Sequence, residues 1–264
     1  MLTKLLKYDL KNILKFISVF YSLAIIFAAL SRFFAIWDSS MVWLVISKIF
    51  AGASISMIFS ILINCMMRSW VRFKMNVYGD ESYLTHTLPV KKETVYLSKL
   101  LCVTITLAIS FVISLLTLFI TYYTKESFEM LKAFISAAMP LKDGISSTLF
   151  IITLVFILFL ELLNAIQFGF TGLIIGHRSN KNKIVSSVLT GLATYSAGQV
   201  AILAIIFVIA LFHKEIMNLF VTTQAVSFGT VKLIVLISAI LYALLIVVNC
   251  IINVKLLKRG VNVE

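Results

Sequence analysis

The chain has 264 residues, of which 61% are hydrophobic and 13% are charged, and its mean hydropathy is +1.06. Soluble domains have roughly 45–50% apolar and about 25% charged residues, so this composition excludes a soluble globular protein and indicates that lipid surrounds most of the chain. The formal net charge is +12, but the basic residues lie at the ends of apolar runs, which favours contact with lipid headgroups over nucleic-acid binding.

The first fifteen residues have a basic face and an apolar face at helical spacing. The basic face consists of Lys4, Lys7, Lys11 and Lys15, and the apolar face of Leu2, Leu5, Leu6, Leu10, Ile13 and Leu14. This pattern is typical of a helix that lies in the plane of the lipid headgroups. We therefore predict an interfacial helix over residues 1–15. The alternative is a plain extension of the first membrane-spanning helix.

Six apolar runs are long enough to cross a bilayer as helices, which requires about 20 residues each. The first run lacks the small-residue cleavage site of a signal peptide, so we predict that it is retained as a span. The predicted fold class is an all-α membrane protein with six transmembrane helices in a single domain, residues 1–264. The predicted spans are Phe16–Ile36, Val42–Met67, Leu100–Tyr123, Ser147–Ile175, Ile184–Phe212 and Leu233–Val254.

The longest polar stretch of the chain, Arg68 to Lys99, separates the second and third predicted spans. It carries six Lys and Arg residues against three acidic ones. Basic excess marks cytoplasmic loops, so we predict a cytoplasmic loop over 68–99. Aromatic and basic residues interleave in its first part, which is typical of a helix along the inner membrane surface. Because Pro89 disfavours helical backbone at the residue before it, we predict two helical pieces.

The distribution of Lys and Arg orients the spans. With both termini inside, 16 of the 23 Lys and Arg residues fall in cytoplasmic segments. We therefore predict a multi-pass protein of the cell membrane with cytoplasmic termini. In this arrangement the connection 124–146 is external, with a short helix around Phe128–Ile135 and a break at Pro140. The sequence HRSNKNK over 177–183 forms a tight inner turn.

The fourth predicted span contains a carboxylate near its middle, Glu161. A carboxylate at the bilayer centre costs a few kcal/mol, so Glu161 is expected to face protein or water. Asn164 and Gln167 follow at steps of three and share a broad face with it. Two interpretations stay open: a stripe that lines a substrate path or subunit contact, and a carboxyl group hydrogen-bonded between packed helices.

Small residues predict close packing of the fourth and fifth spans. Gly172 and Gly176 are one turn apart on the fourth span, and Ser187 and Gly191 are one turn apart on the fifth. Such spacing lets two helix backbones approach closely in lipid. These residues therefore indicate packing and not chemistry.

No motif for ATP, metal or nucleophilic chemistry is present. The patterns GxxxxGK[ST], HExxH and GxGxxG are absent. The segment 144–146 begins like a serine-hydrolase nucleophile elbow, but Thr148 replaces the second glycine. Cys65, Cys102 and Cys250 lie in apolar runs without metal-ligand spacing. We therefore expect a non-catalytic chain with no metal and no cofactor of its own.

Residues Met75–Leu101 resemble the first cytoplasmic loop of bacterial ABC-2 type transporter permeases. In small permeases of Gram-positive bacteria this region has an acidic turn, Tyr-Leu-Thr, Leu-Pro, a basic segment and a Lys before the third span. The corresponding residues here are Asp80-Glu81, Tyr83-Leu84-Thr85, Leu88-Pro89, Lys91-Lys92 and Ser98-Lys99. Many relatives have glycine where this chain has Ser82, so the turn can differ. The rest of the resemblance, six spans after an amphipathic segment, is generic.

The resemblance implies a permease subunit of an ATP-driven exporter. Two such permeases pair, as copies or as two different chains, and each docks a separate ATP-binding subunit that binds the ATP. The coupling residues it implies are Asp80, Glu81, Tyr83, Leu84, Thr85, Leu88 and Pro89. Small relatives often handle antimicrobial peptides or other amphipathic molecules, in export or self-protection. The alternatives are an ATP-independent channel or membrane scaffold, and an intramembrane enzyme.

Overall fold

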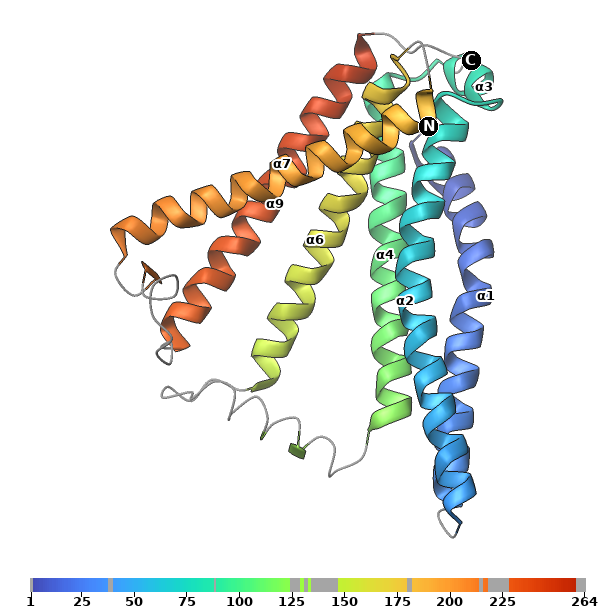
Figure 1. Ribbon diagram of the computed structural model, residues 1–264. Coiled ribbons are helices and arrows are strands. Elements are labelled where there is room, and N and C mark those ends of the chain that lie inside the picture. Colours follow the sequence, from blue (N-terminus) through green and yellow to red (C-terminus); the bar gives the residue numbers. More distant parts are fainter. Residues whose placement is uncertain are drawn as a thin grey trace. The chain divides into compact units, whose positions relative to one another are not determined.

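The computed structural model describes residues 2–37, 40–87, 89–123, 129–130, 133, 147–179, 182–213, 216–217 and 228–259. The helices in these ranges fall into two compact units (Figure 1). The first unit contains α1 (Leu2–Ile36), α2 (Met41–Val77), α3 (Ser82–Thr87) and α4 (Lys92–Tyr122). The second unit contains α6 (Ser147–Gly176), α7 (Lys183–Phe212) and α9 (Phe228–Lys258).

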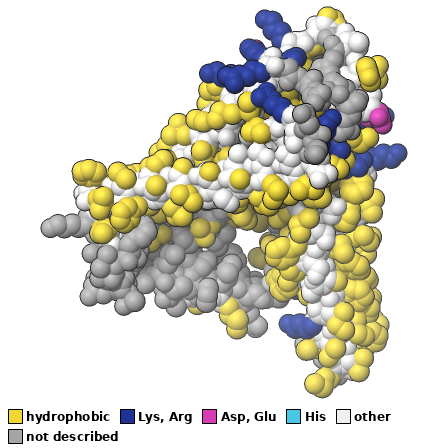
Figure 2. All heavy atoms as spheres, turned by 45° about the horizontal axis from the view of Figure 1, so that its top comes forward, with side chains coloured by type: hydrophobic (Ala, Val, Ile, Leu, Met, Phe, Trp, Pro, Cys, Tyr) yellow, Lys and Arg dark blue, Asp and Glu magenta, His cyan; other side chains and the backbone are white. Residues whose placement is uncertain are grey.

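Six of these helices are long and apolar enough to cross a membrane, namely α1, α2, α4, α6, α7 and α9. Each contains one predicted span to within a residue and most extend beyond it, so the all-α class and the six candidate spans are confirmed. Helices are expected because hydrocarbon offers the backbone no external hydrogen-bond partners. Hydrophobic side chains cover the sides of the helices, and Lys and Arg gather near helix ends (Figure 2).

In the first unit α1, α2 and α4 pack side by side (Figure 1). The buried face of α1 carries residues at steps of three or four: Asp9, Ile13, Ile17, Tyr21, Ala24, Ala28 and Ser31. The hydroxyls of Ser31 and Ser47 each donate to the other's backbone carbonyl, at 3.0 and 2.9 Å. Small residues and interhelical hydrogen bonds of this kind hold helices together in lipid, where apolar burial gives little driving force.

The predicted separate interfacial helix over residues 1–15 is wrong. α1 is a single helix of 35 residues with no break at Lys15, which corresponds to the alternative of an extended first span. The physical reason is that Asp9 and Ile13 are buried, at 2% exposed each. The face of this segment opposite the lysines is therefore held by protein contacts as part of the three-helix unit.

The predicted loop 68–99 is largely helical, because α2 and α4 reach into it from both sides. α2 continues as one helix to Val77, and α4 begins at Lys92. The remaining connection, 78–91, contains the short helix α3. Pro89 lies in the non-helical segment between α3 and α4, so the predicted break at this proline is confirmed.

In the second unit α6 packs against both α7 and α9. A methyl group added to Gly172 would lie 2.5 Å from the Cα of Gly191, and one added to Gly176 would clash with the backbone of Ser187. Contacts this close require residues without side chains. The predicted tight packing of the fourth and fifth spans is confirmed.

Helix α6 ends at Gly176 and α7 begins at Lys183, which confirms a short connection at the predicted turn. Asn182 has a φ of 50°, in the left-handed region that asparagine adopts more readily than most residues. The predicted external helix around Phe128–Ile135 and the break at Pro140 lie outside the described residues, apart from 129–130 and 133. They stay predictions.

Candidate functional site

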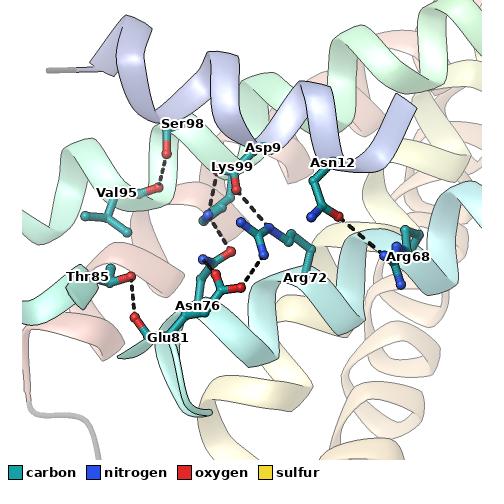
Figure 3. A network of polar contacts seen from close by, with 10 residues as sticks. All are labelled: Asp9, Asn12, Arg68, Arg72, Asn76, Glu81, Thr85, Val95, Ser98 and Lys99. Carbon is teal, nitrogen blue, oxygen red and sulfur yellow. Dashed lines mark hydrogen bonds and ion pairs between the residues drawn. The ribbon is translucent and has the colours of Figure 1, made fainter. Parts of the chain in front are cut away.

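Five polar side chains form a closed ring of contacts near α3 in the first unit (Figure 3). Three helices and the connection contribute to it. The members are Asp9 of α1, Arg72 and Asn76 of α2, Glu81 of the segment before α3, and Lys99 of α4. We call these five residues the charge ring.

The contacts of the charge ring are short and use both oxygens of each carboxylate. Asp9 Oδ2 accepts from Lys99 Nζ at 2.6 Å, and Asp9 Oδ1 from Arg72 Nε at 3.2 Å. Arg72 Nη1 donates to Glu81 Oε1 at 2.7 Å. Asn76 closes the ring, because its Nδ2 donates to Glu81 Oε2 at 2.6 Å and its Oδ1 accepts from Lys99 Nζ at 2.8 Å. Two carboxylates thus balance two cations.

Most of the charge ring is removed from solvent. Asp9, Lys99 and Asn76 are 2%, 6% and 7% exposed, whereas the Glu81 side chain at the rim is 37% exposed. Charges taken out of water are tolerated only when they are paired and hydrogen-bonded, and loss of one partner costs about 3–5 kcal/mol. The ring therefore sets how the ends of α1, α2 and α4 align.

The charge ring also fastens α3. The side chain of Glu81 lies in the ring, while its backbone carbonyl accepts from the amide and the hydroxyl of Thr85, at 3.1 and 3.2 Å. The amide of Ser82 donates to the carbonyl of Gly79 at 2.8 Å, and Ser82 is fully buried. The start of α3 is thus tied to the preceding connection by its backbone and to α1, α2 and α4 through the ring.

Two large side chains of α3 are exposed, although the start of the helix is held by hydrogen bonds. Tyr83 and Leu84 are 69% and 71% exposed, and Asp80 before them is exposed as well. We call these three residues the α3 surface. Adjacent exposed apolar side chains in an otherwise polar connection are a feature of contact sites for other proteins.

The structure describes six of the seven predicted coupling residues and separates them into two groups. Glu81 and Thr85 make the hydrogen bonds that hold the start of α3. Asp80, Tyr83, Leu84 and Pro89 are exposed instead. Leu88 lies outside the described residues.

The sequence reasoning missed Asp9 and Asn76, and it did not predict that Arg72 and Lys99 pair with an acid. A signal for Asp9 was present, because it is the one carboxylate among the first 37 residues. It also lies four and eight residues before Ile13 and Ile17, on the apolar face of the helix. An acid at such a position requires a buried cationic partner.

In the second unit Glu161 lies among polar side chains of the neighbouring helices. Its Oε1 accepts from Tyr195 Oη at 2.5 Å and from Gln199 Nε2 at 2.7 Å, both on α7. Tyr242 Oη of α9 donates to Gln199 Oε1 at 3.4 Å. These bonds join the three helices around one carboxylate within the predicted membrane span.

Asn164 and Gln167 follow Glu161 on the same broad face of α6, and we call the three residues the polar stripe. Asn164 and Gln167 are fully buried. Asn164 Nδ2 donates to the carbonyl of Tyr242 at 3.0 Å. Among the described residues, Glu161 Oε2, Asn164 Oδ1 and both polar atoms of the Gln167 amide find no hydrogen-bond partner. Unsatisfied buried groups are uncommon and mark positions where a further contact would be favourable. A role in a substrate path stays a prediction.

Among the described residues, no group of three or more His, Cys, Asp or Glu side chains could hold a metal ion. Cys65 and Cys102 are buried and Cys250 is half-buried, and all three are free thiols.

No protein-family model matches the sequence, and comparison with curated proteins and with solved structures finds no significant similarity.

Proposed function

We propose that this chain is the transmembrane permease subunit of an ATP-driven exporter, energised by a separate ATP-binding subunit that docks on the α3 surface. The observation that carries the proposal is the anchored α3. Exposed Tyr83 and Leu84 lie on a short helix whose base is bound to three long helices through the charge ring. A push on α3 would therefore reach α1, α2 and α4 together.

The resemblance of Met75–Leu101 to the coupling loop of ABC-2 type permeases supports this assignment. In the proposal the charge ring lies on the cytoplasmic side, both termini are cytoplasmic, and the protein is in the cell membrane. The functional unit contains a second permease, either a copy of this chain or a related one. The cargo is a peptide or another amphipathic molecule. The polar side chains of Glu161, Asn164 and Gln167 line the path of this cargo or form the contact between the two permeases.

Purification of the tagged chain from its native membrane with bound partners tests the proposal. We expect an ATP-binding subunit to co-purify and its ATPase activity to rise with candidate amphipathic peptides. The double variant Tyr83→Ala/Leu84→Ala should lose that subunit while its own melting temperature is unchanged, because both side chains are exposed.

A matched control for this experiment is Leu118→Ala/Tyr122→Ala, which removes an equivalent pair at the far end of α4. These side chains are 39% and 42% exposed, and they lie on the predicted external side. The control should keep the ATP-binding subunit. A stable, transport-active complex without any nucleotide-binding chain would instead favour a channel or scaffold, and cleavage of a substrate by the purified chain would favour an enzyme.

A further inference from the structure

A groove between α1 and α2 combines an apolar floor with two cations. Its volume is about 600 Å³, within the range of roughly 300–1,000 Å³ that ligand pockets commonly have. It is lined by Asn12, Lys15, Phe16, Val19, Phe20 and Arg68. We call it the Arg68 groove.

Arg68 has contacts with Phe16 and Asn12 that fix its position at the groove, and these contacts use few of its N–H donors. Its Cζ lies 4.7 Å from the centroid of the Phe16 ring, a cation–π distance. Its Nη2 donates to Asn12 Oδ1 at 3.4 Å, a long contact that Figure 3 shows. Its Nε is buried and has no partner among the described residues. Because a guanidinium has five N–H donors, Arg68 can still bind an anion.

The positive charge of the Arg68 groove is not balanced by a carboxylate. Asp9, the acid on the same stretch of α1, is already paired with Arg72 and Lys99. In the described part of the chain neither Lys15 nor Arg68 forms an ion pair. The groove therefore favours a ligand that carries negative charge at one end.

The position of these residues along the predicted spans gives the depth of the groove. Lys15 directly precedes the first predicted span, and Arg68 directly follows the second, so both cations lie at the same predicted inner edge of the membrane. Phe16, Val19 and Phe20 lie on the hydrocarbon side of that edge. Val19 is four residues beyond Lys15, or about 6 Å along the helix.

We infer that the Arg68 groove binds an anionic phospholipid, with the phosphate on Arg68 and Lys15 and an acyl chain along Phe16, Val19 and Phe20. Free phosphate would use the cations and leave the apolar floor uncovered. A zwitterionic lipid would cover the floor but would bring its own positive charge to the two cations. The site is independent of the proposed permease function.

Native mass spectrometry of the purified full chain in detergent tests this site, with phosphatidylglycerol and phosphatidylcholine titrated separately. We expect one phosphatidylglycerol to bind roughly ten- to a hundredfold more tightly than phosphatidylcholine, because its phosphate is held by charge-assisted hydrogen bonds. Arg68→Gln should reduce phosphatidylglycerol binding to the phosphatidylcholine level. Lys7→Gln, which removes an equal charge from exposed α1 surface outside the groove, should leave it unchanged.

Val19→Trp provides a second variant that keeps both cations and fills the apolar floor. Val19 is 58% exposed, so the change leaves the core of the unit intact. It should weaken phosphatidylglycerol binding, and excess inorganic phosphate should not compete. Equal binding of the two lipids, unchanged binding in Arg68→Gln and Val19→Trp, or full competition by inorganic phosphate would overturn the inference.

Discussion

Asp9 of α1 forms ion pairs with residues of both α2 and α4. Its two oxygens accept from Arg72 and Lys99, which lie 63 and 90 residues further along the chain. The Asp9 side chain is 3% exposed, so water cannot readily replace a lost partner. Asp9 is therefore the one acid of the ring that pairs with both cations, and among the described residues it is the only carboxylate that pairs with the buried Lys99.

The first prediction concerns Asp9. Asp9→Ala should destabilise the protein by about 3–5 kcal/mol, because Lys99 is left buried without its counter-ion. Thermal unfolding of the purified protein in detergent measures the change. Asp80→Ala is the control and should unfold at the same temperature as the wild type, because Asp80 is exposed. If the two variants unfold alike, the charge ring does not hold the first unit together.

A second prediction concerns the hydroxyl of Tyr195, which donates to Glu161 Oε1. Tyr195→Phe removes one donor from a half-buried carboxylate and should cost about 1.5–3 kcal/mol, the usual range for a hydrogen bond to a charged group. Tyr83→Phe removes an equivalent hydroxyl from an exposed site and should have no effect. Unfolding curves of the two variants, recorded in the same detergent, make the comparison. A Tyr195→Phe protein as stable as Tyr83→Phe would contradict the expectation.

At the scale of elements, the helices are longer than the membrane requires, and the additional turns carry the candidate site. α2 has 37 residues, and its last ten, after Met67, supply Arg72 and Asn76 to the charge ring. The first turns of α4 supply Lys99 in the same way. Because these turns are continuous with the spans, a displacement at α3 can pass directly into the membrane helices.

The contact between α6 and α7 provides a prediction at this scale. Gly172→Val places a side chain against the backbone of Gly191 and should destabilise the second unit by at least the roughly 1–3 kcal/mol typical of overpacking. Gly52→Val makes the same change where nothing lies within 4 Å of the added Cβ. We expect a lower yield of folded protein and earlier thermal unfolding for Gly172→Val alone. Equal behaviour of the two variants would argue against the close helix contact.

At the scale of the whole molecule, the six candidate spans and the distribution of Lys and Arg predict a topology with cytoplasmic termini. An even number of spans returns the chain to the side on which it started. With the orientation predicted from Lys and Arg, the charge ring and the Arg68 groove are expected on the cytoplasmic side, and the connection 124–146 stays a predicted external segment.

Cysteine labelling in cells tests this topology. In a variant without the three native cysteines, Asp80→Cys should react with a membrane-impermeant maleimide only after the cells are permeabilised. Lys125→Cys, in the connection predicted to be external, should react in intact cells. Labelling of Asp80→Cys in intact cells would reverse the orientation and remove the α3 surface from the reach of a cytoplasmic ATPase.

The sequence alone determined the all-α class and the six candidate spans, because the length and hydrophobicity of a segment are local properties that decide whether it can cross a bilayer. It also determined the break at Pro89 and the close approach at Gly172 and Gly176, since the backbone restriction of proline and the missing side chain of glycine act wherever they occur. These features needed no knowledge of which helices are neighbours.

Only the tertiary structure decided that residues 2–15 continue the first long helix and that Asp9, Arg72, Asn76, Glu81 and Lys99 form one ring. Taken one segment at a time, the lysine face at the amino terminus favours a headgroup helix, and Arg72 and Lys99 are two of many basic residues. Asp9 pairs with Arg72 and Lys99, which follow it by 63 and 90 residues, and this pairing depends on which helix faces contact each other. Local hydrophobic pattern does not encode that choice, because contacts between helices in lipid are selected by a few small and polar groups.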